Sequence, residues 1–284
     1  MKLNRKHITE YFKTARERYQ IHMNKDALYK DAPYTKDPIF QEWRFCNVHR
    51  EHDKVSNWIE MNVRQLDVDY HRMVFNLSLC RLINRIETLE IIKEAGLFEK
   101  WDTRKARRKL TGLKPLVGAA YVIKTPTGKN KLEGVLYIVK KIKARLRVTN
   151  QSCPTTLQQQ WEILMKCQFI GSFMAYEITS DMRHTIFLDD ARDINTWAVP
   201  GPGACAGLSW LVDGTLTSVP YRASTREVSI AAMQQLLECS KNEKYWPQEW
   251  PAWEMREAEH WLCEYAKYAK VKHLGMRMKR RYKC

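Results

Sequence analysis

The chain has 284 residues, of which 44% are hydrophobic and 28% charged, proportions that exclude a disordered chain and are typical of soluble globular proteins. Lysine and arginine outnumber acidic residues by 48 to 32, and the formal net charge of +16 favours a polyanionic partner such as nucleic acid. No apolar run approaches the ~18 residues of a membrane-spanning helix, and the N-terminus lacks the apolar segment of a secretory signal. An anionic membrane is the other partner that this charge would suit, but no long amphipathic helix with a basic face stands out, so we expect no membrane partner.

The eight cysteines are scattered, and no two of them form a C-x-x-C pair. This spacing argues against a zinc ribbon and against a cysteine-ligated iron–sulfur cluster. Walker, G-x-S-x-G and G-x-G-x-x-G motifs are also absent from the sequence, which argues against the enzyme classes built on them. We predict reduced thiols, no bound metal and no cofactor.

Apolar residues at helical spacing predict helices through the first hundred residues. The first helix carries Ile8, Tyr11, Phe12, Ala15 and Tyr19 on one face. Others are expected over 38–50, 55–66 and 75–89, with Gly96 as a helix C-cap. Lysine and arginine then crowd residues 97–148, around a turn at 125–128 and a helix or strand over 134–142. This basic region is either a solvated face or a surface that follows a phosphate backbone.

Two helices joined by a tight turn are predicted next. Thr155 or Thr156 is expected to cap a helix that ends near Lys166, and Thr156 with Gln159 fits a capping box. The second helix is expected over 172–183. The remaining chain contains a Pro/Gly turn at 200–203, a helix over about 229–239, a tryptophan-rich segment and a basic tail from Lys267 to Cys284. Few segments alternate with a period of two, so the fold is predicted to be mainly α.

The turn between these two helices contains Phe169, Ile170, Gly171 and Ser172, and it resembles the hairpin of a helix-hairpin-helix motif. Glycine permits a tight turn and a close approach to a phosphate, which the N–H groups at the start of the next helix then face. Such contacts hold DNA without reading its sequence. We predict that residues 169–172 bind DNA; an ordinary packing corner is the alternative.

Asp193 follows the hairpin at the distance where helix-hairpin-helix DNA glycosylases carry an aspartate in their cleft. The alternative for Asp193 is a helix cap or a loop acid. The hairpin departs from those enzymes in two ways: Phe169 occupies the place of their first glycine, and Phe173 the place of the lysine of bifunctional glycosylases. Without that lysine a Schiff-base lyase is not expected.

Three blocks of sequence stand out. The first contains A-R-E-R-Y at 15–19, T-K-D-P-I-F-Q at 35–41 and R-F-C-N-V-H-R-E at 44–51. The second contains G-S-F-M-A-Y-E-I at 171–178, D-M-R-H-T at 181–185, D-I-N-T-W at 193–197 and G-P-G at 201–203. The third contains E-H at 259–260, C-E-Y at 263–265, K-Y at 267–268 and K-R-R-Y at 279–282. Together they resemble the alpha-glutamyl/putrescinyl thymine pyrophosphorylases, phage amino acid:DNA transferases related to the helical domain of 5-hydroxymethyluracil DNA kinases.

The resemblance implies a mainly α fold, like that of helix-hairpin-helix DNA glycosylases, with two helical subdomains and a cleft between them. We expect three regions along the chain. Residues 1–150 form an N-terminal helical region with a basic middle segment, and residues 151–215 hold the hairpin and the catalytic aspartate. Residues 216–284 form a C-terminal helical segment with a basic tail.

The resemblance also implies a reaction. An amino acid or a polyamine displaces (pyro)phosphate from modified 5-hydroxymethyluracil in double-stranded phage DNA, after the base has been flipped out of the stack. The implied setting is the cytoplasm of an infected bacterium, with a functional link to a hydroxymethyluracil DNA kinase. A DNA base glycosylase and a non-catalytic DNA-binding module are the alternatives.

Roles for individual residues follow from the resemblance and from the chemistry. A carboxylate must take a proton from the amine, and cations must stabilise the leaving group. The expected catalytic residues are Asp193, Asn195 and Glu177. The expected substrate- and phosphate-binding residues are Arg44, Asn47, Arg50, Tyr176 and Trp197. Besides the hairpin, the expected DNA-binding residues are Lys279, Arg280 and Arg281.

Overall fold

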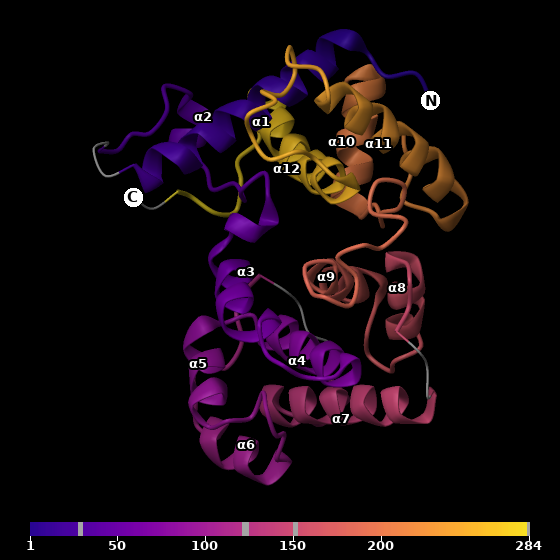
Figure 1. The fold of residues 1–284 in the computed structure, drawn as a ribbon. Coiled ribbons are helices and arrows are strands. Elements are labelled where there is room, and N and C mark those ends of the chain that lie inside the picture. The colour runs from indigo at the N-terminus through magenta and orange to yellow at the C-terminus, as the bar shows by residue number, and fades with distance from the viewer. Residues whose placement is uncertain (28–30, 121–124, 150–152, 283–284) are drawn as a thin grey trace. The chain divides into compact units, whose positions relative to one another are not determined.

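The computed structural model describes residues 1–27, 31–120, 125–149 and 153–282, and it is mainly helical as predicted (Figure 1). Within these ranges the one β pairing is an isolated antiparallel bridge between Trp43 and Arg281. No helix in the described ranges is long and apolar enough to cross a membrane. The seven cysteines in these ranges are free thiols.

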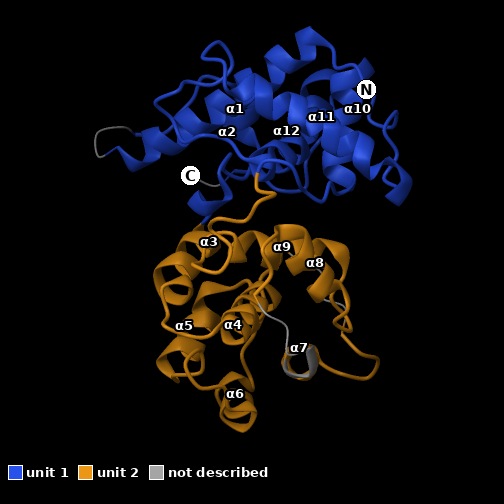
Figure 2. Cartoon of the chain, turned by 45° about the vertical axis from the view of Figure 1, so that its right-hand side comes forward, with its two compact units in different colours: residues 1–53, 195–284 blue, residues 54–194 orange. Residues whose placement is uncertain are grey.

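The chain divides into two compact units, which Figure 2 shows in different colours. Unit 1 comprises residues 1–53 and 195–284, and unit 2 comprises residues 54–194. These units are composed differently from the three regions expected at 1–150, 151–215 and 216–284, because the chain leaves unit 1 after Asp53 and returns at Asn195. The glycosylase-like fold and the cleft between subdomains stay predictions.

Unit 1 is assembled from both ends of the chain. Its elements are α1 (Arg5–Asp26), α2 (Pro38–Glu42), the 3-10 turn η1 (Arg50–His52), α10 (Pro202–Asp213), the 3-10 turn η3 (Ala223–Thr225), α11 (Arg226–Ser240) and α12 (Met255–Leu274). The central helix is α12, which packs against α1, α2, α10 and α11.

The core of unit 1 joins α1 to α12 through aromatic residues. The Tyr11 hydroxyl donates to the Ala258 carbonyl at 3.1 Å, and Trp261 Nε1 donates to the Tyr11 carbonyl at 3.1 Å. Both side chains are fully buried, so these hydrogen bonds satisfy polar atoms that would otherwise be costly inside the core. The predicted apolar face of α1 is therefore the face that packs on α12.

Small residues bring α10 close to α12. A Cβ atom on Gly207 would lie 2.2 Å from the carbonyl oxygen of Leu262, and one on Gly203 would lie 2.3 Å from Cys263 Sγ. Gly201 precedes Pro202, which opens α10. Proline suits the first helical position, because the N–H that it lacks would have no partner inside the helix there. The predicted Pro/Gly turn is therefore the start of a helix.

Unit 2 is continuous in sequence. Its elements are α3 (Lys54–Ile59), the π-helical turn η2 (Glu60–Arg64), α4 (Tyr70–Ile83), α5 (Ile86–Glu94), α6 (Thr103–Leu110), α7 (Lys131–Thr149), α8 (Leu157–Met165) and α9 (Ser172–Met182). The buried helix α4 packs against α5, α7 and α9. The segment over 134–142, predicted as helix or strand, is part of α7.

A buried ion cluster joins three elements of unit 2. Asp181 of α9 accepts hydrogen bonds from Arg64 Nη2 and Arg81 Nη2, each at 2.6 Å, and from Arg81 Nε. Arg81 Nη2 also lies 3.0 Å from Ser56 Oγ. Burial disfavours the charged carboxylate, but the two guanidinium groups more than offset this, so the pKa of Asp181 is lowered. Asp181 therefore fixes α9 against α4 and η2.

Two predicted helices are wrong in their extent. The helix expected over 75–89 is two helices, because Asn84 adopts a left-handed conformation with φ of 45° and ends α4. The helix expected over 38–50 ends at Glu42. The chain beyond Glu42 is extended, and the C-terminal tail supplies hydrogen-bond partners for its backbone. Arg44 N donates to the Arg280 carbonyl, and Tyr282 N donates to the Glu42 carbonyl.

Candidate functional site

The hairpin predicted from the sequence lies in unit 2, where α8 and α9 pack against each other. Thr156 Oγ1 accepts from Gln159 N at 3.1 Å, which confirms Thr156 as the cap of α8. The left-handed residue of the turn is Phe169, with φ of 69°, whereas Gly171 is extended with φ of −87°. The expectation that the tight turn depends on Gly171 is therefore wrong.

Gly171 still leaves the start of α9 open. No heavy atom lies within 4 Å of the place where its Cβ would be. The side chains of Phe169 and Phe173 are 37% and 54% exposed, while Ile170 is buried in unit 2. The hairpin thus exposes two aromatic side chains and one backbone segment to solvent. Ile170 instead packs in the interior of unit 2.

Asp193 lies at the start of α8. Its Oδ1 accepts from Leu157 N at 2.7 Å, and its Oδ2 accepts from Gln158 N at 2.9 Å. With Thr156 on Gln159 N, the first three N–H groups of α8 therefore have side-chain acceptors. This is the helix-capping arrangement that the sequence left open as the alternative to catalysis.

Replacing Asp193 with alanine is expected to lower the free energy of unfolding by about 1 kcal/mol, because α8 loses two capping hydrogen bonds. Asp193→Asn keeps a side-chain acceptor and should lose less. Urea denaturation of both variants measures the effect. Equal stability of the alanine variant and the wild type would contradict the capping role.

Tyr176 and Glu177, the other predicted site residues on α9, are both buried, with exposed fractions of 4% and 2%. Glu177 therefore does not face solvent. A buried carboxylate is costly unless it has partners, and such groups cluster at functional sites. Glu177 keeps its place among the expected catalytic residues.

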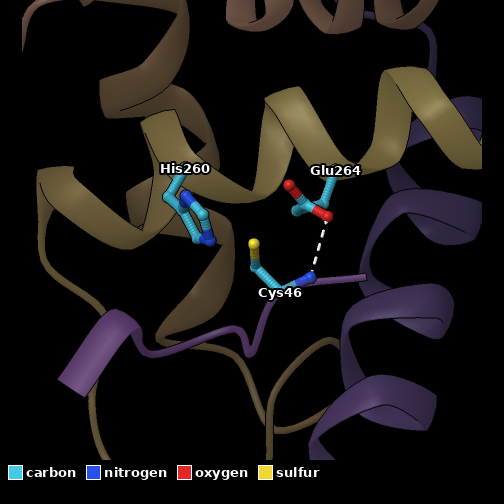
Figure 3. A group of neighbouring side chains, drawn as sticks. All are labelled: Cys46, His260 and Glu264. Carbon is cyan, nitrogen blue, oxygen red and sulfur yellow. Dashed lines mark hydrogen bonds between the residues drawn. The ribbon is translucent and has the colours of Figure 1, made fainter. Parts of the chain in front are cut away.

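Unit 1 holds a cluster of ionisable side chains where the first and third sequence blocks meet. We call it the Cys46 cluster; its members are Arg18, Cys46, Arg50, Asp53, His260, Glu264 and Lys267. His260 and Glu264 lie one turn apart on α12 and project to the same side, toward Cys46 on the loop after α2 (Figure 3). A ligand atom of each of these three side chains lies within 4.8 Å of the other two.

Hydrogen bonds hold the loop in this position. Cys46 N donates to Glu264 Oε2 at 3.0 Å, and the Asn47 carbonyl lies 3.2 Å from His260 Nε2. The Asn47 backbone and side-chain nitrogens donate to Asp53 Oδ1 at 3.1 and 3.2 Å, and Arg50 Nε lies 3.6 Å from Asp53 Oδ2. Segment 44–53 is thus tied to α12 at Cys46 and Asn47 and is braced internally by Asp53.

Burial determines the charges in the cluster. It raises the pKa of Cys46 to about 12, with the neighbouring Glu264 adding to the shift, so the thiol is protonated at neutral pH. It also raises the pKa of Asp53 and lowers that of Arg18. Burial opposes the charge on Lys267, but the adjacent Glu264 carboxylate more than offsets it and raises the pKa of Lys267.

The Cys46 cluster is more cationic than anionic. Arg18, Arg50 and Lys267 face two carboxyl groups and a neutral thiol, and Arg18 Nη1 is buried with no hydrogen-bond partner in the described ranges. The sulfur, nitrogen and oxygen donors of Cys46, His260 and Glu264 suit zinc. However, Glu264 is already paired with Lys267. The surplus of cations therefore favours an anionic oxygen ligand over a metal.

Two of the predicted phosphate-binding residues in segment 44–53 lie at this cluster, and the third lies outside it. Arg50 is a member of the cluster and Asn47 contacts its Asp53, whereas the side chain of Arg44 is exposed beside the C-terminal tail. The Asn47 amide also donates to the His52 carbonyl at 2.8 Å, so it shapes the loop.

Asn195 lines a cavity of about 480 Å³ in unit 1. Its walls include the aromatic rings of Trp246, Trp250 and Trp253, with Gln234 and Gln248 as polar groups. Trp197 is buried. The lining also includes Glu238 and Lys241, which form an ion pair. Apolar faces with a few polar groups are typical of small-molecule sites.

The basic tail follows the end of α12. Lys279, Arg280 and Arg281 are exposed, and Arg281 lies near Glu42 at 3.7 Å and over the Trp43 ring. Part of the predicted tail, Lys267 to Leu274, is helical and belongs to α12. The last two residues lie outside the described ranges.

Sequence reasoning missed Arg18, Cys46, Asp53, His260, Glu264 and Lys267 as one group. The useful signal is the spacing of His260 and Glu264, which places two polar side chains on one face of a helix. Nothing local connects them to Cys46, which is distant in sequence and joins them only through the fold.

Comparison with known proteins defines the family. Residues 5–278 match the family described as 5-hmdU DNA kinase, helical domain, and the chain belongs to this family. The 5-hmdU DNA kinase of Bacillus phage SP10 is 25% identical over 287 residues, which cover 91% of this chain and 44% of that protein. The chain thus spans less than half the length of this relative. No solved structure matches the chain. The predicted relation to the helical domain of 5-hydroxymethyluracil DNA kinases is confirmed.

Proposed function

We propose that the protein transfers an amine, from an amino acid or a polyamine, onto (pyro)phosphorylated 5-hydroxymethyluracil in phage DNA. The observation that carries the proposal is the cationic Cys46 cluster, built from the blocks that carry the family resemblance. The relative is named as a kinase of 5-hmdU in DNA. A kinase reaction converts a hydroxymethyl group into a phosphate ester, and the phosphate of that ester is the leaving group that this transfer requires.

The reaction forms one bond and breaks one. The lone pair of a neutral amine attacks the methylene carbon on C5 of the base, and a C–N bond forms. The C–O bond breaks, and its electron pair leaves with the (pyro)phosphate oxygen. A carboxylate takes the proton from the amine nitrogen.

The Cys46 cluster supplies the charges that the leaving group needs. Arg18, Arg50 and Lys267 are fixed and partly desolvated, so they stabilise a developing phosphate anion more strongly than mobile surface cations would. Arg44, exposed on the same loop, is the residue we assign to the outer phosphate oxygens. Asn47 sets the conformation of this loop.

The proton acceptor is one of the predicted carboxylates. The resemblance makes Asp193 and Glu177 the expected proton acceptors, and it makes Asn195 an expected catalytic residue. Both Asp193 oxygens accept backbone hydrogen bonds. Comparing Asp193→Asn, which retains an acceptor for α8, with Asp193→Ala separates lost capping from lost catalysis. Full turnover by both variants would leave Glu177 as the candidate.

Mass spectrometry of digested nucleosides tests the reaction. Duplex DNA that carries 5-phosphomethyl-deoxyuridine, or its pyrophosphate counterpart, is incubated with the protein and a pool of amino acids and polyamines. A nucleoside that has gained one amine and lost the phosphate is expected, and its mass identifies the donor. A released base would instead indicate a glycosylase, and unchanged DNA with both substrates would contradict catalysis.

A pair of exposed arginines provides a matched control. Arg44→Ala is expected to lower turnover about tenfold or more if Arg44 contacts the leaving phosphate, because a charge-assisted contact is lost. Arg5→Ala, on the surface of α1, removes the same charge outside the cluster and should leave turnover unchanged.

A further inference from the structure

A basic groove follows one face of α7 in unit 2, outside the Cys46 cluster. The residues at 133, 137, 140 and 144 are three or four positions apart and therefore share this face. Together with α6 they border a cavity of about 610 Å³. We call this feature the α7 groove and define it by the following side chains: Trp101, Arg107, Lys129, Tyr137, Lys140 and Lys143.

The groove continues toward α4. A second cavity, of about 250 Å³, shares Lys143 with the first and is also lined by Asp69, Arg72 and Phe75. The rings of Phe75 and Trp101 are in edge contact, with centroids 5.1 Å apart, so the aromatic lining continues from one cavity into the next. The result is an elongated basic surface in place of an isolated pocket.

The carboxylates along the groove are already occupied. Glu133 is held by Arg107 through two hydrogen bonds of 2.7 and 3.0 Å, and Asp69 accepts from Arg72 N as the cap of α4. Among the residues that the structure describes, Glu133 pairs with Arg107, and the exposed Lys129 acts on it only as a more distant charge; no carboxylate pairs with the exposed Lys140. The groove therefore has positive charge available for a polyanion.

Aromatic rings alternate with these cations. The Tyr137 ring lies under the ammonium groups of both Lys129 and Lys141, 5.6 and 5.3 Å from its centroid. Trp101 is half-buried at the other side of the groove. Cation–π contacts with Tyr137 hold these ammonium groups in place along the groove.

Tyr137 also connects the groove to the hairpin. Its hydroxyl lies 3.3 Å from Gln168 Oε1, and its ring contacts the Phe169 ring with centroids 5.8 Å apart. The turn between α8 and α9 is therefore the rim of the same surface. A chain of phosphates bound in the groove would pass directly to the open backbone at Gly171.

We propose that the α7 groove binds the phosphate backbone of the DNA and that the hairpin extends this contact. The inference rests on the proposed function, because it takes DNA as the substrate. The groove then holds the duplex by charge, without reading its sequence.

Binding to a short, fluorescein-labelled, unmodified duplex tests the groove. The full-length double variant Lys129→Gln/Lys140→Gln is compared with Lys13→Gln/Lys93→Gln, which removes the same charge from exposed positions outside the groove. The slope of log K against log salt is expected to become shallower by about 2 for the groove variant. Its affinity at low salt should fall about tenfold or more, and circular dichroism checks that both variants are folded.

The outcomes separate this inference from the proposed function. If wild-type protein binds DNA and the two double variants behave alike, the groove is not the DNA site, and the amine transfer is unaffected. If the wild type binds anionic vesicles but not the duplex, the groove inference is overturned and the transferase loses its substrate as well.

Discussion

Asp181→Ala is expected to lower the free energy of unfolding of unit 2 by about 3–5 kcal/mol, because it removes the carboxylate from a buried ion cluster. Asp181 receives three hydrogen bonds from Arg64 and Arg81, and all three side chains are at most 4% exposed. Without the carboxylate, two guanidinium charges remain in a low-dielectric interior. Urea denaturation followed by circular dichroism measures the loss.

Asp190→Ala is the matched control, since Asp190 is exposed on the same unit and should change stability by less than ~0.5 kcal/mol. The pH dependence gives a second test. The folded-state pKa of Asp181 is lowered below its ordinary value of 3.8, so its stabilisation is complete above that value and is lost as the pH falls below it. Wild-type protein should therefore lose stability in acid more steeply than Asp181→Ala. Equal stability of the Asp181 and Asp190 variants at neutral pH would contradict the role of the cluster.

Gly207→Ala is expected to lower the free energy of unfolding by about 3 kcal/mol, because the added methyl group would overlap the backbone of α12. The new Cβ would lie 2.2 Å from the Leu262 carbonyl oxygen and 2.8 Å from its carbonyl carbon. These atoms belong to the backbone of the central helix of unit 1, so no side chain can rotate to relieve the overlap. Thermal unfolding followed by circular dichroism reports the change.

Gly201→Ala is the control for this prediction. It lies at the start of α10, where an added Cβ would be 4.0 Å from Glu259 Oε1, an ordinary contact distance. Its effect should be limited to the modest preference of a helix cap for glycine over alanine. Equal stability of the Gly207→Ala and Gly201→Ala variants would contradict the close approach of α10 to α12.

Helices with local signals could be predicted from the sequence. The periodic face of α1 and the Thr156 cap of α8 are both encoded within a few residues. The helix α12 lacks such a signal, because it is buried on nearly all sides and carries buried polar residues such as Glu257, His260 and Glu264 among its apolar ones. No polar stripe then marks its solvent face.

The candidate site was harder to predict, since its geometry depends on contacts between distant segments. Asp193 could be identified as a notable acid, but its partners Leu157 and Gln158 come from another part of the chain. The Cys46 cluster joins α1, the loop after α2 and α12. Spacing rules apply within a segment, so they indicated Asn47 and Arg50 and missed the buried groups that surround them.

The way the chain enters and leaves unit 1 determines the order in which the protein can fold during synthesis. Every residue of unit 2 is made before α10, α11 and α12 emerge from the ribosome. Unit 2 can therefore fold first, although it begins later in the sequence. Until α12 has been synthesised, the apolar face of α1, with Tyr11 and Phe12, lacks this packing partner. A nascent chain that stalls within α11 would contain a folded unit 2 and an α1 whose apolar face is exposed. This stage of translation is therefore the one most prone to aggregation and to chaperone binding.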